Sequence, residues 1–139
     1  MKKSDRQKIF DKYGGRCAYC GCELQKGWHV DEIEPVRRGF EYIKDAKGNS
    51  IWENGKWLTK KNMRHPERLN IENQNPSCAS CNINKHSESL EQFRKNIAAY
   101  MKHLNEVSIQ YKIAKRYGLI QETGIGVEFY FETLNEESV

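Results

Sequence analysis

Four of the five cysteines form two pairs with the same spacing, and they carry the clearest chemistry in the chain. The pairs are Cys17-Ala-Tyr-Cys20 and Cys78-Ala-Ser-Cys81. A C-x-x-C turn lets two thiolates converge on one ion, and Gly21 gives the first turn the conformational room it needs. Two such turns supply a closed tetrahedral shell, so we expect one structural zinc ion. Two disulfides or a redox dithiol are the less favoured alternatives.

The two cysteine pairs lie far apart, so a zinc ion bound to both would clamp a long intervening loop. Hydrophobic residues make up 37% of the 139 residues, and the mean hydropathy is −0.88. An average globular chain is about 45–50% apolar. Coupled metal binding and folding would therefore offset a modest core. The fifth cysteine, Cys22, is expected to be a bystander thiol, with replacement of a neighbouring ligand as the alternative.

Length and charge restrict the class of protein further. A chain of 139 residues fits one domain with a small appendage, which excludes two independent large cores. The formal charge of +4 and the sequence pI of about 8.8 suit a polyanionic partner. No segment approaches the roughly 18 apolar residues of a membrane span, and the first ten residues lack the apolar run of a signal peptide. We expect a soluble intracellular protein.

The elements that position the cysteines can be read from periodicity and caps. We expect a helix over Ser4–Tyr13 with Ser4 as its N-cap, and a strand within residues 28–35 that ends at or just before Pro35. Residues 36–70 read as a long hairpin-like excursion with a turn at Asn54-Gly55.

The chain after the second cysteine pair reads as two helices and a strand. Ser89 and Gln92 form a capping box before an amphipathic helix over residues 90–104, and a second helix over 107–117 stops at Gly118. Residues 125–132 alternate apolar and polar side chains, which predicts a strand, and 135–139 read as a frayed tail.

The order of the motifs resembles that of the HNH endonuclease family, in its zinc-bracketed, phage-type members. The motifs are the first cysteine pair, the segment Val30-Asp31-Glu32-Ile33-Glu34-Pro35, then Asn73, and then Cys78-x-x-Cys81-Asn82-x-x-Lys85. The resemblance covers residues 15–86 directly. It implies an α+β fold: a small ββα-metal hairpin and helix clamped by a four-cysteine zinc site, with C-terminal helices and a short strand. We expect a nuclease domain over residues 1–105 and an extension over 106–139 packed on it.

The resemblance also implies roles for individual residues. Asp31 and Asn82 would hold a catalytic Mg²⁺ or Mn²⁺, since hard carboxylate and carbonyl oxygens suit these ions. Asn73 would hold the hairpin loop and orient the general base. Lys85 would lie at the start of the helix and contact phosphate. The ion would polarise the scissile phosphate while the base deprotonates water.

The sequence departs from the family pattern at the general base. The family reads Asp-His-Ile-x-Pro, whereas this chain has Glu32 at the histidine position. Three explanations stay open. Glu32 inactivates an otherwise intact nuclease, or Glu32 itself acts as the base, or His29 replaces it because His29 shares a strand face with Asp31.

The resemblance implies duplex DNA as the partner and phosphodiester hydrolysis, nicking or cleaving, as the reaction. Phage DNA-packaging proteins are further candidate partners, and a phage-encoded nuclease would act in the cytoplasm of its bacterial host. A non-catalytic, zinc-stabilised DNA-binding module is the alternative function. Besides Lys85, the residues expected to contact DNA are Arg37, Arg38, Lys60, Lys61 and Arg64, with a solvated charged face as the competing interpretation. Trp52 and Trp57 are expected to act as packing anchors, or else to stack on bases.

Overall fold

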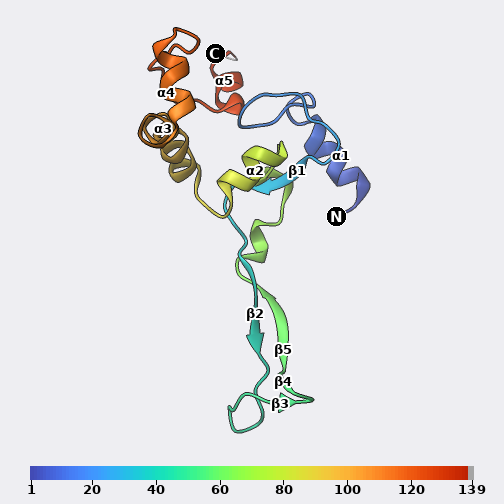
Figure 1. The fold of residues 1–139 in the computed structure, drawn as a ribbon. Helices are drawn as coiled ribbons and strands as arrows, with labels where there is room; N and C mark the ends of the chain where they lie inside the picture. Colours follow the sequence, from blue (N-terminus) through green and yellow to red (C-terminus); the bar gives the residue numbers. More distant parts are fainter. Residues whose placement is uncertain (138–139) are drawn as a thin grey trace.

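The structure, a computed structural model, describes residues 1–137 and confirms a mixed α+β chain with small antiparallel sheets (Figure 1). The helices are α1 (Lys3–Asp11), α2 (Ala79–Lys85), α3 (Leu90–Val107), α4 (Ile109–Arg116) and α5 (Tyr130–Glu137), with short 3-10 turns η1 (Pro66–Arg68) and η2 (Ile71–Asn73). The strands are β1 (His29–Glu32), β2 (Arg38–Tyr42), β3 (Trp52–Glu53), β4 (Lys56–Trp57), β5 (Thr59–Met63) and β6 (Gln74–Ser77). Within this described part, no helix is long and apolar enough to cross a membrane.

Strands β1 and β6 form the antiparallel pair at the centre of the molecule, and helix α2 follows β6 directly. Asp31 pairs with Asn75, and His29 pairs with Ser77. Helix α2 packs against β1, as Figure 1 shows. The two strands belong to distant parts of the sequence, because the whole excursion from 33 to 73 lies between them. The result is a two-stranded hairpin with a long insertion and a helix on one face.

The insertion is a two-stranded arm, defined here as residues 37–64, that projects away from the rest of the molecule (Figure 1). Strands β2 and β5 form its shaft, and β3 and β4 form its tip. The tip turns at Asn54 and Gly55, whose φ angles of 52° and 76° are both positive. This is the left-handed pair that a two-residue hairpin turn requires, so the turn read from Asn-Gly is confirmed.

The core is small and lies beside the cysteines. Cys17, Tyr19, Phe93 and Phe129 form its buried cluster, with Cys78, Cys81, Leu90, Ile97 and Phe131 packed around it. The Phe93 and Phe129 rings stack with centroids 5.5 Å apart. A core of this size agrees with the low hydrophobic fraction, and it makes a metal clamp at the cysteines physically useful.

The predicted helices are present, although one cap differs. The hydroxyl of Ser89 accepts a hydrogen bond from the Gln92 backbone N–H at the start of α3, which confirms that cap. Helix α4 ends before Gly118, whose φ is 77°. Helix α1 begins one residue before Ser4, with Lys2 in the cap position and no side-chain cap bond. The assignment of Ser4 as N-cap was therefore wrong.

The predicted strand over residues 125–132 is also wrong. Residues 120–129 are irregular, and helix α5 begins at Tyr130. The backbone N–H groups of Tyr130 and Phe131 donate to the carbonyls of Tyr19 and Ala18, at 3.0 and 2.9 Å. The segment thus docks on the first cysteine turn and inserts Phe129 into the core. Among residues 1–137 it pairs with no strand. Helix α5 includes 135–137 of the expected frayed tail, and residues 138–139 lie outside the described part.

Candidate functional site

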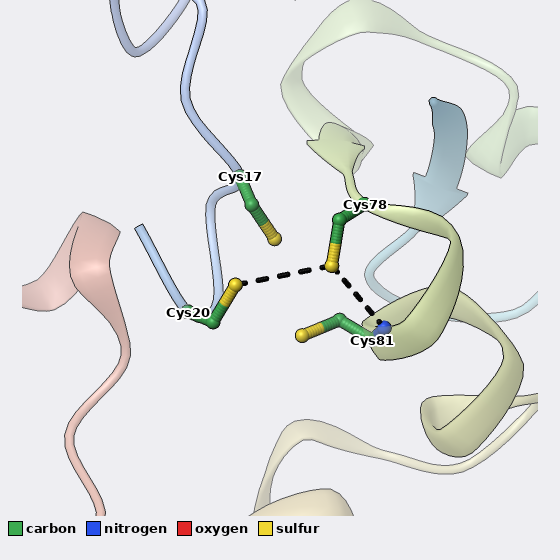
Figure 2. Close-up of side chains that lie close together, drawn as sticks. All are labelled: Cys17, Cys20, Cys78 and Cys81. Carbon is green, nitrogen blue, oxygen red and sulfur yellow. Dashed lines mark hydrogen bonds between the residues drawn. The ribbon is translucent and has the colours of Figure 1, made fainter. Parts of the chain in front are cut away.

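The four paired cysteines converge on one point, as Figure 2 shows. The sulfurs of Cys17, Cys20, Cys78 and Cys81 all lie within 4.8 Å of one another, and those of Cys20 and Cys78 are 3.8 Å apart. Four sulfurs at about 2.3 Å from a tetrahedral ion are about 3.8 Å from each other. The donor set therefore fits one metal ion and leaves no ligand position open. Cys22 is exposed and is not one of these four ligands, but its thiol lies within hydrogen-bond reach of the Cys20 and Cys78 thiols.

Local backbone structure explains why the two turns present their sulfurs. In the first turn, the Gly21 N–H donates to the Cys17 carbonyl at 3.0 Å, and Gly21 has a φ of 76°. A Cβ at Gly21 would strain the backbone at this φ, and it would lie 3.1 Å from the Tyr130 ring, a tight contact that requires the ring to shift slightly. In the second turn, the Cys78 sulfur caps α2 by accepting from the Cys81 N–H at 3.4 Å.

The environment of Cys17 favours its thiolate. The pKa of the Cys17 thiol is lowered to about 4, first by the hydrogen bond from the Cys81 thiol and then, against burial, by backbone N–H groups that include those of Cys78 and Cys20. Thiolates are the form that ligates metal ions. The Cys81 thiol and the surrounding backbone N–H groups therefore both stabilise the Cys17 thiolate.

A second polar site lies between β1 and α2. His29 and Asp31 alternate along β1 and both face the helix, where they meet Asn82 and Lys85 respectively. The Nδ1 atom of His29 lies 2.6 Å from the Nδ2 atom of Asn82, and both residues are half-buried. A half-turn of the Asn82 amide would exchange its nitrogen for its oxygen. The expected metal ligand Asn82 and the candidate base His29 thus lie in direct contact.

Asp31 lies in the more deeply buried part of this site, and its carboxylate is paired with protein side chains. Its carboxylate lies 3.1 Å from the Lys85 ammonium and accepts a hydrogen bond from the Tyr19 hydroxyl. Burial raises the pKa of Asp31, while Lys85 and Tyr19 oppose that rise. Burial first, and then the charge of Asp31, raise the pKa of Tyr19, so the phenol stays protonated and donates. In this structure Asp31 is held by protein partners and is not an open ligand.

Lys85 is not placed as expected. It lies in the last turn of α2 instead of at the start of the helix, and its side chain has no exposed surface. Its ammonium also donates to the Glu32 carbonyl at 3.2 Å. Burial of a charged ammonium is tolerated only when it has charged or hydrogen-bonding partners. Here the two carboxylate oxygens of Asp31 and the carbonyl oxygen of Glu32 are those partners. The assignment of Lys85 to phosphate contact was therefore wrong.

Glu32 turns away from this site. Its carboxylate pairs with the guanidinium of Arg38, Oε1 to Nη2, at 2.9 Å. Because successive side chains of a strand point to opposite faces, Glu32 lies on the side of β1 away from Asp31 and His29. The structure thus separates the two candidates for the general base, since His29 faces α2 and Glu32 faces the arm.

Asn73 ties the segment after β1 to the base of the arm. Its Oδ1 accepts from the Glu34 N–H at 2.9 Å, and its Nδ2 donates to the carbonyls of Glu34 and Arg68, both at 2.9 Å. These contacts hold the loop that follows Asp31. Orientation of a base by Asn73 stays a prediction.

The residues expected to contact DNA lie on the arm or at its base. Arg37 and Arg64 line an open cleft beside the start of α3, and the Arg64 N–H donates to the Arg37 carbonyl at 3.1 Å. Lys61 is exposed on the shaft, whereas Lys60 pairs with Glu41 at 3.0 Å and Arg38 pairs with Glu32. All five side chains are solvent-accessible, and their contact with DNA stays a prediction.

Two features were missed by the sequence reasoning. Tyr19, inside the first C-x-x-C motif, holds Asp31, and no local pattern in the sequence marks that role. Phe40 and Tyr42 are exposed on the arm, where Tyr42 lies next to both Phe40 and Trp57. The period-two run Arg38-x-Phe40-x-Tyr42 was the available signal for one basic and aromatic strand face.

Comparisons of the chain with family models, curated proteins and solved structures find no match. The likeness to HNH endonucleases therefore rests on the order of the motifs in the sequence.

Proposed function

We propose that the protein is a divalent-metal-dependent DNA endonuclease of the HNH type, which nicks or cleaves duplex DNA by phosphodiester hydrolysis. The observation that carries the proposal is the contact between His29 and Asn82, 2.6 Å apart on the face of β1 that also bears Asp31. A histidine positioned by an amide can act as a general base, and the amide oxygen and the nearby carboxylate are the kinds of ligand that Mg²⁺ or Mn²⁺ takes. The β1–β6 pair with α2 behind it, bracketed by the cysteine cluster, supports the same proposal.

In this proposal His29 is the general base and Asn82 a metal ligand. Of the two metal ligands expected from the sequence, Asn82 is partly exposed to solvent. Asp31 could bind a metal ion only after the Lys85 ammonium has moved away from it. Mg²⁺ or Mn²⁺ at this point would polarise the scissile phosphate and stabilise the leaving oxygen. His29 would accept the proton of the attacking water, and the arm would hold the DNA. The cysteine cluster would hold zinc as a structural ion.

The test is cleavage of supercoiled plasmid in Mg²⁺, Mn²⁺ or EDTA, with the zinc content measured after EDTA treatment. The protein should nick the plasmid only with added Mg²⁺ or Mn²⁺, and Asn82→Ala should lower the rate at least about tenfold. Asn84→Ala is the matched control, because Asn84 lies on the same helix and is exposed. Cleavage that persists in EDTA, or that is equal for the two variants, would contradict the proposal.

A second candidate, a non-catalytic DNA-binding module, is favoured by one observation. The Lys85 ammonium takes the place beside Asp31 that a catalytic cation would need. This candidate predicts duplex binding with no cleavage in any metal. Glu32→His separates it from an inactivated nuclease, because cleavage gained by that single change would show that the rest of the machinery is intact.

A further inference from the structure

One face of the arm gathers its aromatic side chains. Strand β2 presents Arg38, Phe40 and Tyr42 on the same side, and the antiparallel register places Lys61 opposite Phe40. The other side of the shaft carries Gly39, Glu41, Lys60 and Asn62. At the tip, Trp52 and Trp57 pair directly and so share a side.

The four rings form a continuous row in which each lies next to the following one, and they leave much of their surface in solvent. Their centroids are separated by 5.8 Å for Phe40–Tyr42, 6.4 Å for Tyr42–Trp57 and 5.0 Å for Trp52–Trp57. Their exposed fractions are 62% for Phe40, 46% for Tyr42, 59% for Trp52 and 49% for Trp57. We call these four residues the aromatic face. A contiguous exposed patch of large rings is the mark of a binding surface.

The charge of the arm indicates what such a surface binds. Residues 37–64 hold eight Lys and Arg against three Asp and Glu, a formal +5, whereas the whole chain carries +4. The rest of the molecule is therefore close to neutral, and the positive charge is concentrated where the rings are. Lys44 lies over the Tyr42 ring, with Nζ 5.8 Å from its centroid. Rings interleaved with cations complement a polyanion that also offers flat apolar groups, which describes nucleic acid.

We propose that the aromatic face binds unpaired DNA bases, so that the substrate is DNA with a single-stranded, mismatched or branched segment. This proposal rests on the proposed function, because it names the DNA on which that nuclease site would act. Lysines and arginines reach phosphates in any duplex, but rings can stack only on bases that have left the helical stack. Exposed rings contribute little to binding of an intact duplex, whose bases present only their edges. The arm thus selects the distorted part of the substrate.

The experiment compares two labelled duplexes of equal length, one fully paired and one with a central unpaired bubble. Fluorescence anisotropy measures binding in Ca²⁺, with cleavage assayed separately in Mg²⁺ and Mn²⁺. We expect the bubble to bind at least about tenfold more tightly. Trp52→Ala with Trp57→Ala should abolish this preference and leave the affinity for paired duplex within about twofold.

Two variants serve as controls. Tyr117→Ala removes an aromatic ring that is 81% exposed on another part of the molecule, and it should keep the preference. Trp52→Phe with Trp57→Phe keeps rings at the tip and should retain most of it, which guards against loss of arm structure. Equal binding of bubble and paired duplex by the unchanged protein would overturn this inference alone. Binding of neither duplex would overturn this inference together with the proposed function. Bubble-selective binding without cleavage would support the binding of unpaired bases and contradict the proposed nuclease activity.

Discussion

Asp31 and Lys85 form a buried ion pair, 3.1 Å apart, that joins strand β1 to helix α2. Their side chains are 5% and 0% exposed, and the Tyr19 hydroxyl completes the cluster. Together the three side chains connect the first cysteine turn, strand β1 and helix α2. The Lys85 ammonium also lies where the resemblance to HNH endonucleases implies a metal ion beside Asp31.

Removal of one partner of this pair should destabilise the fold strongly. Lys85→Met leaves the Asp31 carboxylate buried without its cation, and we expect a loss of about 3–5 kcal/mol in the free energy of unfolding. Urea denaturation followed by circular dichroism measures it. Lys60→Met, in the exposed pair with Glu41, is the control and should leave the unfolding midpoint nearly unchanged. An unaltered midpoint for Lys85→Met would show that the pair does not hold α2 to β1.

The cysteine cluster should bind one zinc ion per chain, and removal of that ion should unfold the protein. Structural zinc sites contribute about 10–16 kcal/mol of apparent binding free energy, which a small core does not replace. Elemental analysis should find one zinc in the unchanged protein and in Cys22→Ser, and far less in Cys78→Ser. Retention of the full melting temperature after chelation, or loss of zinc from Cys22→Ser, would contradict this assignment.

Asn73→Ala should loosen the base of the arm. The change removes one accepted and two donated hydrogen bonds, including those to both backbone groups of Glu34. We expect a cost of about 1–3 kcal/mol, because partly buried backbone groups lose their partners. Limited proteolysis should cut the variant faster between β1 and the arm. Asn84→Ala serves as the comparison, and equal cleavage of the two variants would argue against a structural role for Asn73.

The arm should supply the salt-sensitive part of DNA binding. A variant with Lys60, Lys61 and Arg64 all changed to Gln should bind paired duplex more weakly. The slope of log K against log salt concentration should also become shallower by about 0.9 for each phosphate that the variant no longer neutralises. Lys102→Gln, on α3 with an 81% exposed side chain, should keep the original slope. An unchanged slope in the arm variant would place the DNA elsewhere on the molecule.

Structural features that depend on residues only a few positions apart could be predicted from the sequence. Asn54-Gly55 encodes its own turn, because both residues tolerate positive φ. Ser89 caps the helix that follows it, because its partner lies three residues away. The cysteine cluster was also predictable, because two C-x-x-C pairs of identical spacing are typical ligands of one structural zinc ion.

Features that depend on contacts between residues far apart in the sequence could not be predicted from it. The alternation over residues 125–132 indicated an extended, half-buried segment, but whether it pairs as a strand depends on a neighbour, and this segment docks on Tyr19 and Ala18 instead. The burial of Lys85 depends on Asp31, which lies 54 residues earlier in the sequence. The contact of His29 with Asn82 likewise needs β1, β6 and α2 to be assembled first.

The central claim is that hydrolysis occurs between β1 and α2 with His29 as the base, and the most direct test is the plasmid cleavage rate of His29→Ala beside Glu32→Gln. His29→Ala should lower the rate by about 10²–10⁴, while Glu32→Gln, on the other face of β1, should stay within a few-fold of the unchanged protein. His103→Ala, an exposed histidine on α3, controls for the substitution itself. Loss of cleavage in Glu32→Gln with full activity in His29→Ala would contradict the account.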